Sequence, residues 1–163
     1  MPLNTPVWVV KSWPLNAIFR VLLNSPLTIM KKIDIACVID DDDIYTFTVK
    51  RIIDNSKLAE KTLFFANGKL ALDFFNQYLY ELASLPDLIL LDINMPVLDG
   101  WQFMDEFIKL SPLINKRIVV YIVSSSIDQA DFNKAKGYEQ ISDFIVKPIS
   151  AATFRKMVED IAA

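Results

Sequence analysis

The sequence contains no histidine, one cysteine and three glycines among its 163 residues. Without histidine, a Ser-His-Asp hydrolase, His-based general acid–base catalysis and most zinc sites are excluded. The single cysteine, Cys37, excludes an internal disulfide and a thiolate cluster. The glycines, at positions 68, 100 and 137, cannot form a Walker loop or a dinucleotide-binding motif. The remaining chemistry must therefore use carboxylates, hydroxyls, lysines and a hard metal ion.

An excess of positive charge is also lacking. Lys and Arg number 17 against 20 Asp and Glu, so the formal net charge is −3. A protein that wraps nucleic acid needs a basic surface, so we expect no nucleic-acid partner. No apolar run approaches the ~20 residues that cross a bilayer, so no membrane span is expected. The hydrophobic content of 53% suits one domain with a large core.

Residues 1–29 differ in composition from the rest of the chain. They hold two basic residues and no acidic residue, together with four prolines and two of the three tryptophans. Three interpretations of this segment stay open: a stretch of doubtful biological standing, an ordered or partner-binding extension, or an amphipathic piece that touches a membrane. We therefore divide the chain into an N-terminal extension, 1–29, and a main domain, 30–163.

From residue 33 onward, short apolar runs rich in branched residues alternate with stretches of helical periodicity. Nearly continuous runs of this kind are typical of strands buried on both faces of a sheet. The predicted strands are Ile33–Ile39, Thr62–Ala66, Leu88–Leu91, Ile118–Val123 and Phe144–Val146. This alternation predicts an α/β fold, a doubly wound parallel sheet of five strands with five helices on its two faces.

Apolar side chains recur every three to four residues between these strands, as in amphipathic helices. The first such stripe consists of Tyr45, Val49, Ile52 and Ile53. A wide stripe follows at 71–82, and further stripes lie at 103–110, at 128–136, where the pattern is weak, and at 154–161. Asp42 and Asp43 directly precede the first stripe, and we expect them to cap its helix and complement its dipole.

Chemically reactive side chains follow four of the five predicted strands. They are Asp40–Asp43, Asp92, Ser124–Ser126 and Lys147. In an open parallel sheet, ligands bind beyond the carboxyl ends of the strands, so these groups are expected to share one cleft. Clustered carboxylates favour a hard cation such as Mg²⁺, and a carboxylate nucleophile with a lysine and a hydroxyl suits phosphoryl transfer.

The segment Leu90–Gly100 resembles the phosphoacceptor segment of two-component response-regulator receiver domains. Val38–Asp41 resembles the acidic pair of that family, Ile122–Ser125 its switch hydroxyl segment and Phe144–Pro148 its Lys-Pro segment. All four occur in the family's order and each lies at a strand end. The resemblance implies the flavodoxin-like receiver fold.

The resemblance also implies the role of each site residue. Asp92 would be the phosphorylated nucleophile, and Asp40, Asp41, Asp92 and the main-chain carbonyl of Asn94 would hold Mg²⁺. Lys147 and Ser124 would bind the phosphoryl group, and Phe144 would be the aromatic switch. The Lys147–Pro148 bond is a candidate cis peptide. Phe144 lacks a phenol oxygen, and the segment 137–143 departs from the family's short connection.

The implied function is that of a cytoplasmic receiver in a two-component system or phosphorelay, expected to be a single domain and not an enzyme. A histidine kinase or His-phosphotransfer protein would supply the phosphoryl group. Phosphorylation would change the surface formed by the receiver's fourth helix, fifth strand and fifth helix, which binds a downstream protein or a second copy of the chain.

Two alternatives remain at this point. In a phosphatase resembling the haloacid-dehalogenase superfamily, Asp40 would be the nucleophile and Asp42 the acid. That interpretation leaves the Leu90–Gly100 segment unexplained and needs acidic ligands after Lys147, where only Glu159 and Asp160 remain. The other alternative is a receiver-like interaction module that is never phosphorylated.

Overall fold

The computed structural model describes residues 31–161, and the expected extension 1–29 lies outside them. Five parallel strands form one sheet in the order β2-β1-β3-β4-β5. Their bounds are β1 Ile33–Ile39, β2 Ala59–Phe65, β3 Leu88–Leu91, β4 Val119–Ser124 and β5 Ile141–Val146. The predicted doubly wound α/β fold is therefore confirmed.

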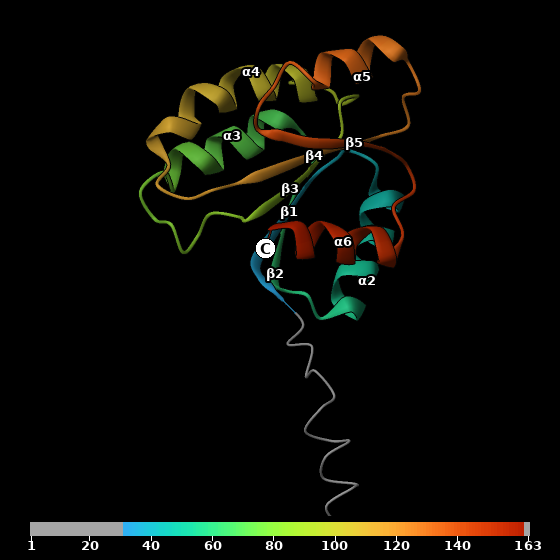
Figure 1. Cartoon of the computed structure of the whole chain (residues 1–163). Coiled ribbons are helices and arrows are strands. Elements are labelled where there is room, and N and C mark those ends of the chain that lie inside the picture. The colour runs from blue at the N-terminus through green and yellow to red at the C-terminus, as the bar shows by residue number, and fades with distance from the viewer. Residues whose placement is uncertain (1–30, 162–163) are drawn as a thin grey trace, which may run out of the picture. The chain divides into compact units, whose positions relative to one another are not determined.

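Helices cover both faces of the sheet (Figure 1). Their bounds are α2 Asp43–Ser56, α3 Gly68–Gln77, α4 Gly100–Leu110, α5 Gln129–Ala135 and α6 Ala151–Ile161, with a short 3₁₀ helix at Ser111–Leu113. Helices α2 and α6 lie on one face, whereas α3, α4 and α5 lie on the other (Figure 1). Within residues 31–161, no helix is both long and apolar enough to cross a bilayer.

The two faces of the sheet carry separate hydrophobic clusters. On the α3–α4 face, Phe75, Phe103 and Phe107 are at most 1% exposed and pack over Cys37 of β1, which is fully buried. The other cluster joins the sheet to Val49 and Ile53 of α2 and to Phe154 and Val158 of α6. The central strands are buried on both sides, which is why their apolar runs are nearly continuous, with Asp34 of β1 and Ser124 of β4 as the polar residues.

Three predicted elements have different bounds in the structure. The two edge strands start earlier than predicted, β2 at Ala59 and β5 at Ile141, because their first residues face solvent in part and include polar side chains. The stripe predicted through 71–82 overruns its helix, because α3 ends at Gln77 and the chain continues in turns. The expected cap of α2 is confirmed, with Asp42 accepting hydrogen bonds from two backbone N–H groups of the first turn.

Candidate functional site

Three residues that directly follow strands continue the hydrogen-bonding pattern of the sheet. Their backbone N–H groups donate to the last residue of a neighbouring strand, which fixes their positions. The pairs are Asp40 N–H to Phe65 O, Asp92 N–H to Ile39 O and Lys147 N–H to Ser124 O, each at 2.9 Å. Because the sheet is parallel, all three extensions occur at the carboxyl edge. The predicted site residues are thus held by the main chain of the sheet itself.

Three carboxylates gather at this edge. Asp40 and Asp92 are buried, with 4% and 6% of their surface exposed, whereas Asp41 is exposed. One carboxylate oxygen from each residue lies within 4.8 Å of the others. Oxygen donors grouped this closely, with one open to solvent, fit a hard divalent cation that keeps part of its water shell.

Lys147 lies between the two buried acids. Its Nζ is 2.6 Å from Asp40 Oδ2 and 3.0 Å from Asp92 Oδ2. Burial raises the pKa of Asp40, and the hydrogen bonds from Lys147 and from the Asp42 N–H offset this only in part. Burial by itself lowers the pKa of Lys147, but its hydrogen bonds to both acids outweigh burial, so that its pKa is raised. The peptide bond between Lys147 and Pro148 is cis.

Tyr45 of α2 completes the surroundings of Lys147. The ammonium lies 4.3 Å from the centroid of the Tyr45 ring. In the sequence, Tyr45 is one member of an apolar helical stripe, and nothing local to it indicates a contact with a lysine at the far end of the chain. The sequence shows only that an aromatic residue, Tyr45, follows the acidic run after the first strand by about one helical turn.

Ser124 and Asn94 line the site beside Asp92. The Asn94 backbone N–H donates to Asp92 Oδ1 at 3.2 Å, and its side-chain Nδ2 donates to Ser124 Oγ at 3.4 Å. Ser124 is the fully buried last residue of β4, so its hydroxyl belongs to the strand and not to the following turn. The structure therefore brings together Asp40, Asp41, Asp92, Asn94, Ser124 and Lys147.

Comparison with known protein families shows which family has this arrangement of residues. Residues 36–159 match the response regulator receiver domain. The chain belongs to this family. The receiver match gives no support to the haloacid-dehalogenase-like alternative, and the acids which that alternative requires, Glu159 and Asp160, lie exposed on α6.

Individual receivers share sequence and fold with this chain. Response regulator Rcp1 of Synechocystis sp. is 29% identical over 126 residues, which are 76% of this chain and 83% of Rcp1. A two-component response regulator from Cytophaga hutchinsonii has 32% identity and a TM-score of 0.73, covering 80% of this chain and 98% of its own. The Mn²⁺-bound structure of Rcp1 has 26% identity and a TM-score of 0.62, covering 78% and 91%.

A side-chain network joins the receiver's buried hydroxyl to two helices. The Ser126 N–H donates to Ser124 Oγ at 3.3 Å, and Ser126 Oγ donates to Asp131 Oδ2 of α5 at 2.5 Å. Asp131 Oδ1 accepts from Trp101 Nε1 of α4 at 3.2 Å. The Trp101 ring stacks on Tyr138, with centroids 5.9 Å apart. The sequence does not indicate this network, because its members share no local pattern.

Phe144, the predicted aromatic switch, lies outside the carboxylate cluster. It is half-buried on β5, and its ring centroid is 4.2 Å from that of Phe132 on α5. The receiver thus covers Phe144 with α5, the same helix that holds Asp131. A displacement of α5 would change the packing of this ring.

Proposed function

We propose that this receiver accepts a phosphoryl group on Asp92 from a phosphohistidine of a histidine kinase or phosphotransfer protein. The receiver domain occupies residues 30–163 and acts in the cytoplasm, as a phosphoacceptor and not as an enzyme with other substrates. The observation that carries the proposal is the placement of Asp92, which is buried beside two further carboxylates and 3.0 Å from the Lys147 ammonium.

The chain's own residues account for the transfer step. A carboxylate oxygen of Asp92 attacks phosphorus in line, an O–P bond forms, and the P–N bond to the donor's imidazole breaks. The products are an acyl phosphate on Asp92 and a free histidine on the donor. Lys147 neutralises charge on the phosphoryl oxygens, and the Ser124 hydroxyl donates a hydrogen bond to one of them.

We assign Asp40, Asp41, Asp92 and the main-chain carbonyl of Asn94 as the residues that hold Mg²⁺. The spacing of the three carboxylates and their oxygen chemistry support this assignment. The Mn²⁺-bound structure of the relative Rcp1 also supports it, since Mn²⁺ prefers the same oxygen ligands. The bound cation would supply charge neutralisation for phosphate oxygens beside Asp92.

We propose that the output surface consists of α5, β5 and α6. Capture of the Ser124 hydroxyl by the phosphoryl group would break its hydrogen bond with Ser126 and shift α5, on which Phe132 covers Phe144. Ile127 and Val146 are 80% and 41% exposed beside this surface, which supports a role in binding. A downstream protein is the proposed occupant, and a second copy of the chain is the alternative.

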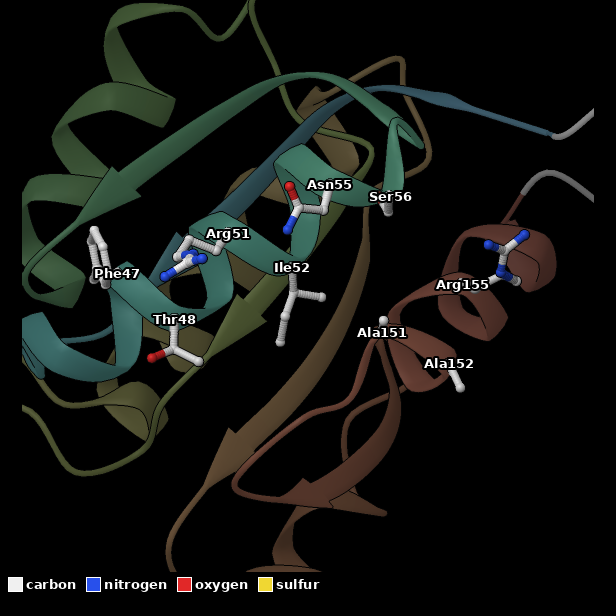
Figure 2. A pocket seen from close by; sticks show the side chains of 9 residues that line it. All are labelled: Phe47, Thr48, Arg51, Ile52, Asn55, Ser56, Ala151, Ala152 and Arg155. Atoms are coloured by element: carbon white, nitrogen blue, oxygen red, sulfur yellow. The ribbon is translucent and has the colours of Figure 1, made fainter.

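We propose that the phosphodonor docks on a groove between α2 and α6, shown in Figure 2. The groove has a volume of about 560 Å³. Its lining residues are Phe47, Thr48, Arg51, Ile52, Asn55 and Ser56 of α2 with Ala151, Ala152 and Arg155 of α6. Helix α2 begins directly after the acidic run and α6 begins shortly after Lys147, so a protein on the groove reaches the rim of the site.

Charge complementarity indicates the chemistry of this donor. Arg51 and Arg155 stand on the two helices that flank the groove (Figure 2), and neither forms a salt bridge within residues 31–161. Phe47 on the same helix is 62% exposed. A donor surface with an apolar centre and acidic side chains would pair with both features.

The proposal is tested with a small phosphodonor such as phosphoramidate in the presence of Mg²⁺. We expect the parent chain to gain one phosphate by intact mass spectrometry and Asp92→Asn to gain none. Asp43→Asn is the matched control, because Asp43 is an exposed acid in the first turn of α2 outside the carboxylate cluster. Labelling of Asp92→Asn at the parent level, or phosphate mapped to Asp40, contradicts the proposal.

A further inference from the structure

Tyr45 makes a contact with Lys147 that the receiver function described above leaves without a role. The ammonium of Lys147 lies 2.6 Å from Asp40 Oδ2, 3.0 Å from Asp92 Oδ2 and 4.3 Å from the centroid of the Tyr45 ring. We propose that Tyr45 is a positioning residue, whose ring face holds Lys147 toward Asp92 through a cation–π interaction. This inference rests on the proposed function, since it concerns the orientation of Lys147 for phosphoryl transfer.

The acidic run that precedes α2 places Tyr45 at this point. Asp40 Oδ1 accepts a hydrogen bond from the Asp42 N–H at 2.9 Å. Asp42 Oδ1 in turn accepts from the N–H groups of Ile44 and Tyr45, both at 2.9 Å, and so caps the helix. The position of the Tyr45 backbone is thereby tied to Asp40, one of the two acids that bind Lys147.

The ring, and not the hydroxyl, is the part of Tyr45 that contacts the lysine. Within residues 31–161, Tyr45 Oη is buried and forms no hydrogen bond of good geometry. Burial raises the pKa of this phenol, the charge of Asp40 raises it further, and the nearby Ile149 backbone offsets this only in part, so the side chain stays neutral. A neutral ring attracts an ammonium through its π face, which phenylalanine also provides and leucine does not.

The ring differs from the other two neighbours of Lys147 in one functional respect. Asp40 and Asp92 both belong to the carboxylate group assigned to the divalent cation. When Asp40 serves as a ligand, it shares its negative charge with the cation, so its ion pair with Lys147 is weakened. Tyr45 cannot act as a ligand through its ring carbons, so its contact with Lys147 persists and keeps the ammonium beside Asp92.

The first test compares initial rates of Asp92 phosphorylation by phosphoramidate and Mg²⁺ in the parent, Tyr45→Phe and Tyr45→Leu. Tyr45→Phe retains the ring and is expected to rescue the parent rate. Tyr45→Leu is expected to be about fivefold slower, the change that a cation–π interaction of ordinary strength produces. Equal rates in the two variants, whether both slow or both unchanged, overturn the proposal.

The second test separates positioning from a structural role by repeating the comparison in a Lys147→Met background. We expect Tyr45→Leu to have no further effect there, because the cation is gone. A fivefold loss that persists without the lysine shows that Tyr45 acts only through packing, and overturns the proposal. Urea unfolding of each variant checks that all are folded under the assay conditions.

A third readout needs no phosphorylation and no metal ion. In ¹³C-lysine-labelled protein, the ε protons of Lys147, identified by their loss in Lys147→Met, should be shifted upfield by the ring in the parent and in Tyr45→Phe. In Tyr45→Leu they should return to the ordinary lysine position, and an unchanged shift overturns the proposal. A parent chain that takes up no phosphate would instead remove the proposed function, so the two failures are distinguishable.

Discussion

Lys147 balances the charge of two buried carboxylates when no divalent cation is bound. Its side chain is 11% exposed and lies within 3.0 Å of both Asp40 and Asp92. Removing one member of a buried ionic group leaves the remaining charges uncompensated. We therefore expect Lys147→Met to lower the free energy of unfolding by about 3 kcal/mol in EDTA, as measured by urea denaturation.

Magnesium provides the internal control for this variant. A divalent cation among the three carboxylates replaces the missing positive charge, so Mg²⁺ should restore part of the lost stability. The comparison variant is Lys109→Met, whose ion pair with Glu106 is exposed on α4 and should contribute little. An equal loss in Lys147→Met with and without Mg²⁺ would show that charge balance is not the cause.

Val97 holds an unfavourable backbone conformation in the loop after β3. Its φ is 69°, in the left-handed region, and the Leu98 N–H donates to Pro96 O at 2.8 Å in a three-residue γ-turn. A β-branched side chain is strained in this region, and the Val97 side chain is 81% exposed, so no burial compensates for the strain.

Relief of this strain gives a second prediction. Val97→Gly should raise the free energy of unfolding by about 1 kcal/mol, because glycine adopts positive φ without a steric penalty. Urea denaturation measures the change. Val97→Ala keeps the Cβ atom and should gain less, so a larger gain for alanine than for glycine would contradict the explanation.

At the scale of residues, the sequence predicts the charged groups of the site better than their contacts. Asp40, Asp92 and Lys147 could be found because each directly follows a buried strand of a parallel sheet. The contact between Tyr45 and Lys147 could not be found, because it depends on how α2 packs beside the chain after β5. Packing between distant elements leaves no periodic or local signal in the sequence.

A chain of hydrogen bonds links helix α5 to the buried hydroxyl of the site. Ser124, Ser126 and Asp131 form one chain of donors and acceptors that ends at the indole of Trp101 on α4. Beryllofluoride with Mg²⁺, which mimics the phosphoryl group, should draw the Ser124 hydroxyl away from Ser126. We expect a shift in Trp101 fluorescence emission that requires this chain to be intact.

Two variants test this coupling. Trp101→Phe should abolish the shift, which assigns it to α4 and separates it from Trp8 and Trp13 outside the described residues. Asp131→Asn retains the size of the side chain but weakens the hydrogen bond from Ser126, and should reduce the shift. A full response in Asp131→Asn would mean that the site reaches α4 by another route.

At the scale of elements, the central strands were predicted to within one residue and the edge strands were not. In β1 and β3 both faces are covered by helices, so apolar residues run without interruption from Ile35 to Ile39 and from Leu88 to Leu91. In β2 and β5 the early residues are partly exposed and include Glu60, Lys61, Ser142 and Asp143. A strand with polar residues toward solvent lacks the continuous run that marks a buried strand.

At the scale of the whole molecule, the proposed docking surface is separate from the carboxylate cluster. Arg51 and Arg155 flank the α2–α6 groove and are not members of the carboxylate cluster. In the double variant Arg51→Glu, Arg155→Glu, the rate of phosphotransfer from autophosphorylated histidine kinases should therefore fall at least tenfold, because the new acidic side chains repel the proposed acidic donor surface. A tenfold loss corresponds to about 1.4 kcal/mol.

The small phosphodonor supplies the control for this surface. Phosphoramidate needs no docking, so the double variant should take up phosphate from it at the parent rate. Arg117→Glu, a charge reversal on the loop before β4, is the matched control and should leave both reactions unchanged. Equal losses with the kinase and with phosphoramidate would indicate damage to the site and contradict a separate docking surface.

The burial of Cys37 has a practical consequence for experiments on the whole molecule. Its side chain lies in the middle of the sheet with no exposed surface, and burial raises the pKa of its thiol. Thiol reagents should therefore modify the native chain only when the sheet opens. The rate of thiol modification therefore measures the rate at which the sheet opens. A second cysteine placed on the surface can carry a spectroscopic label while Cys37 is kept.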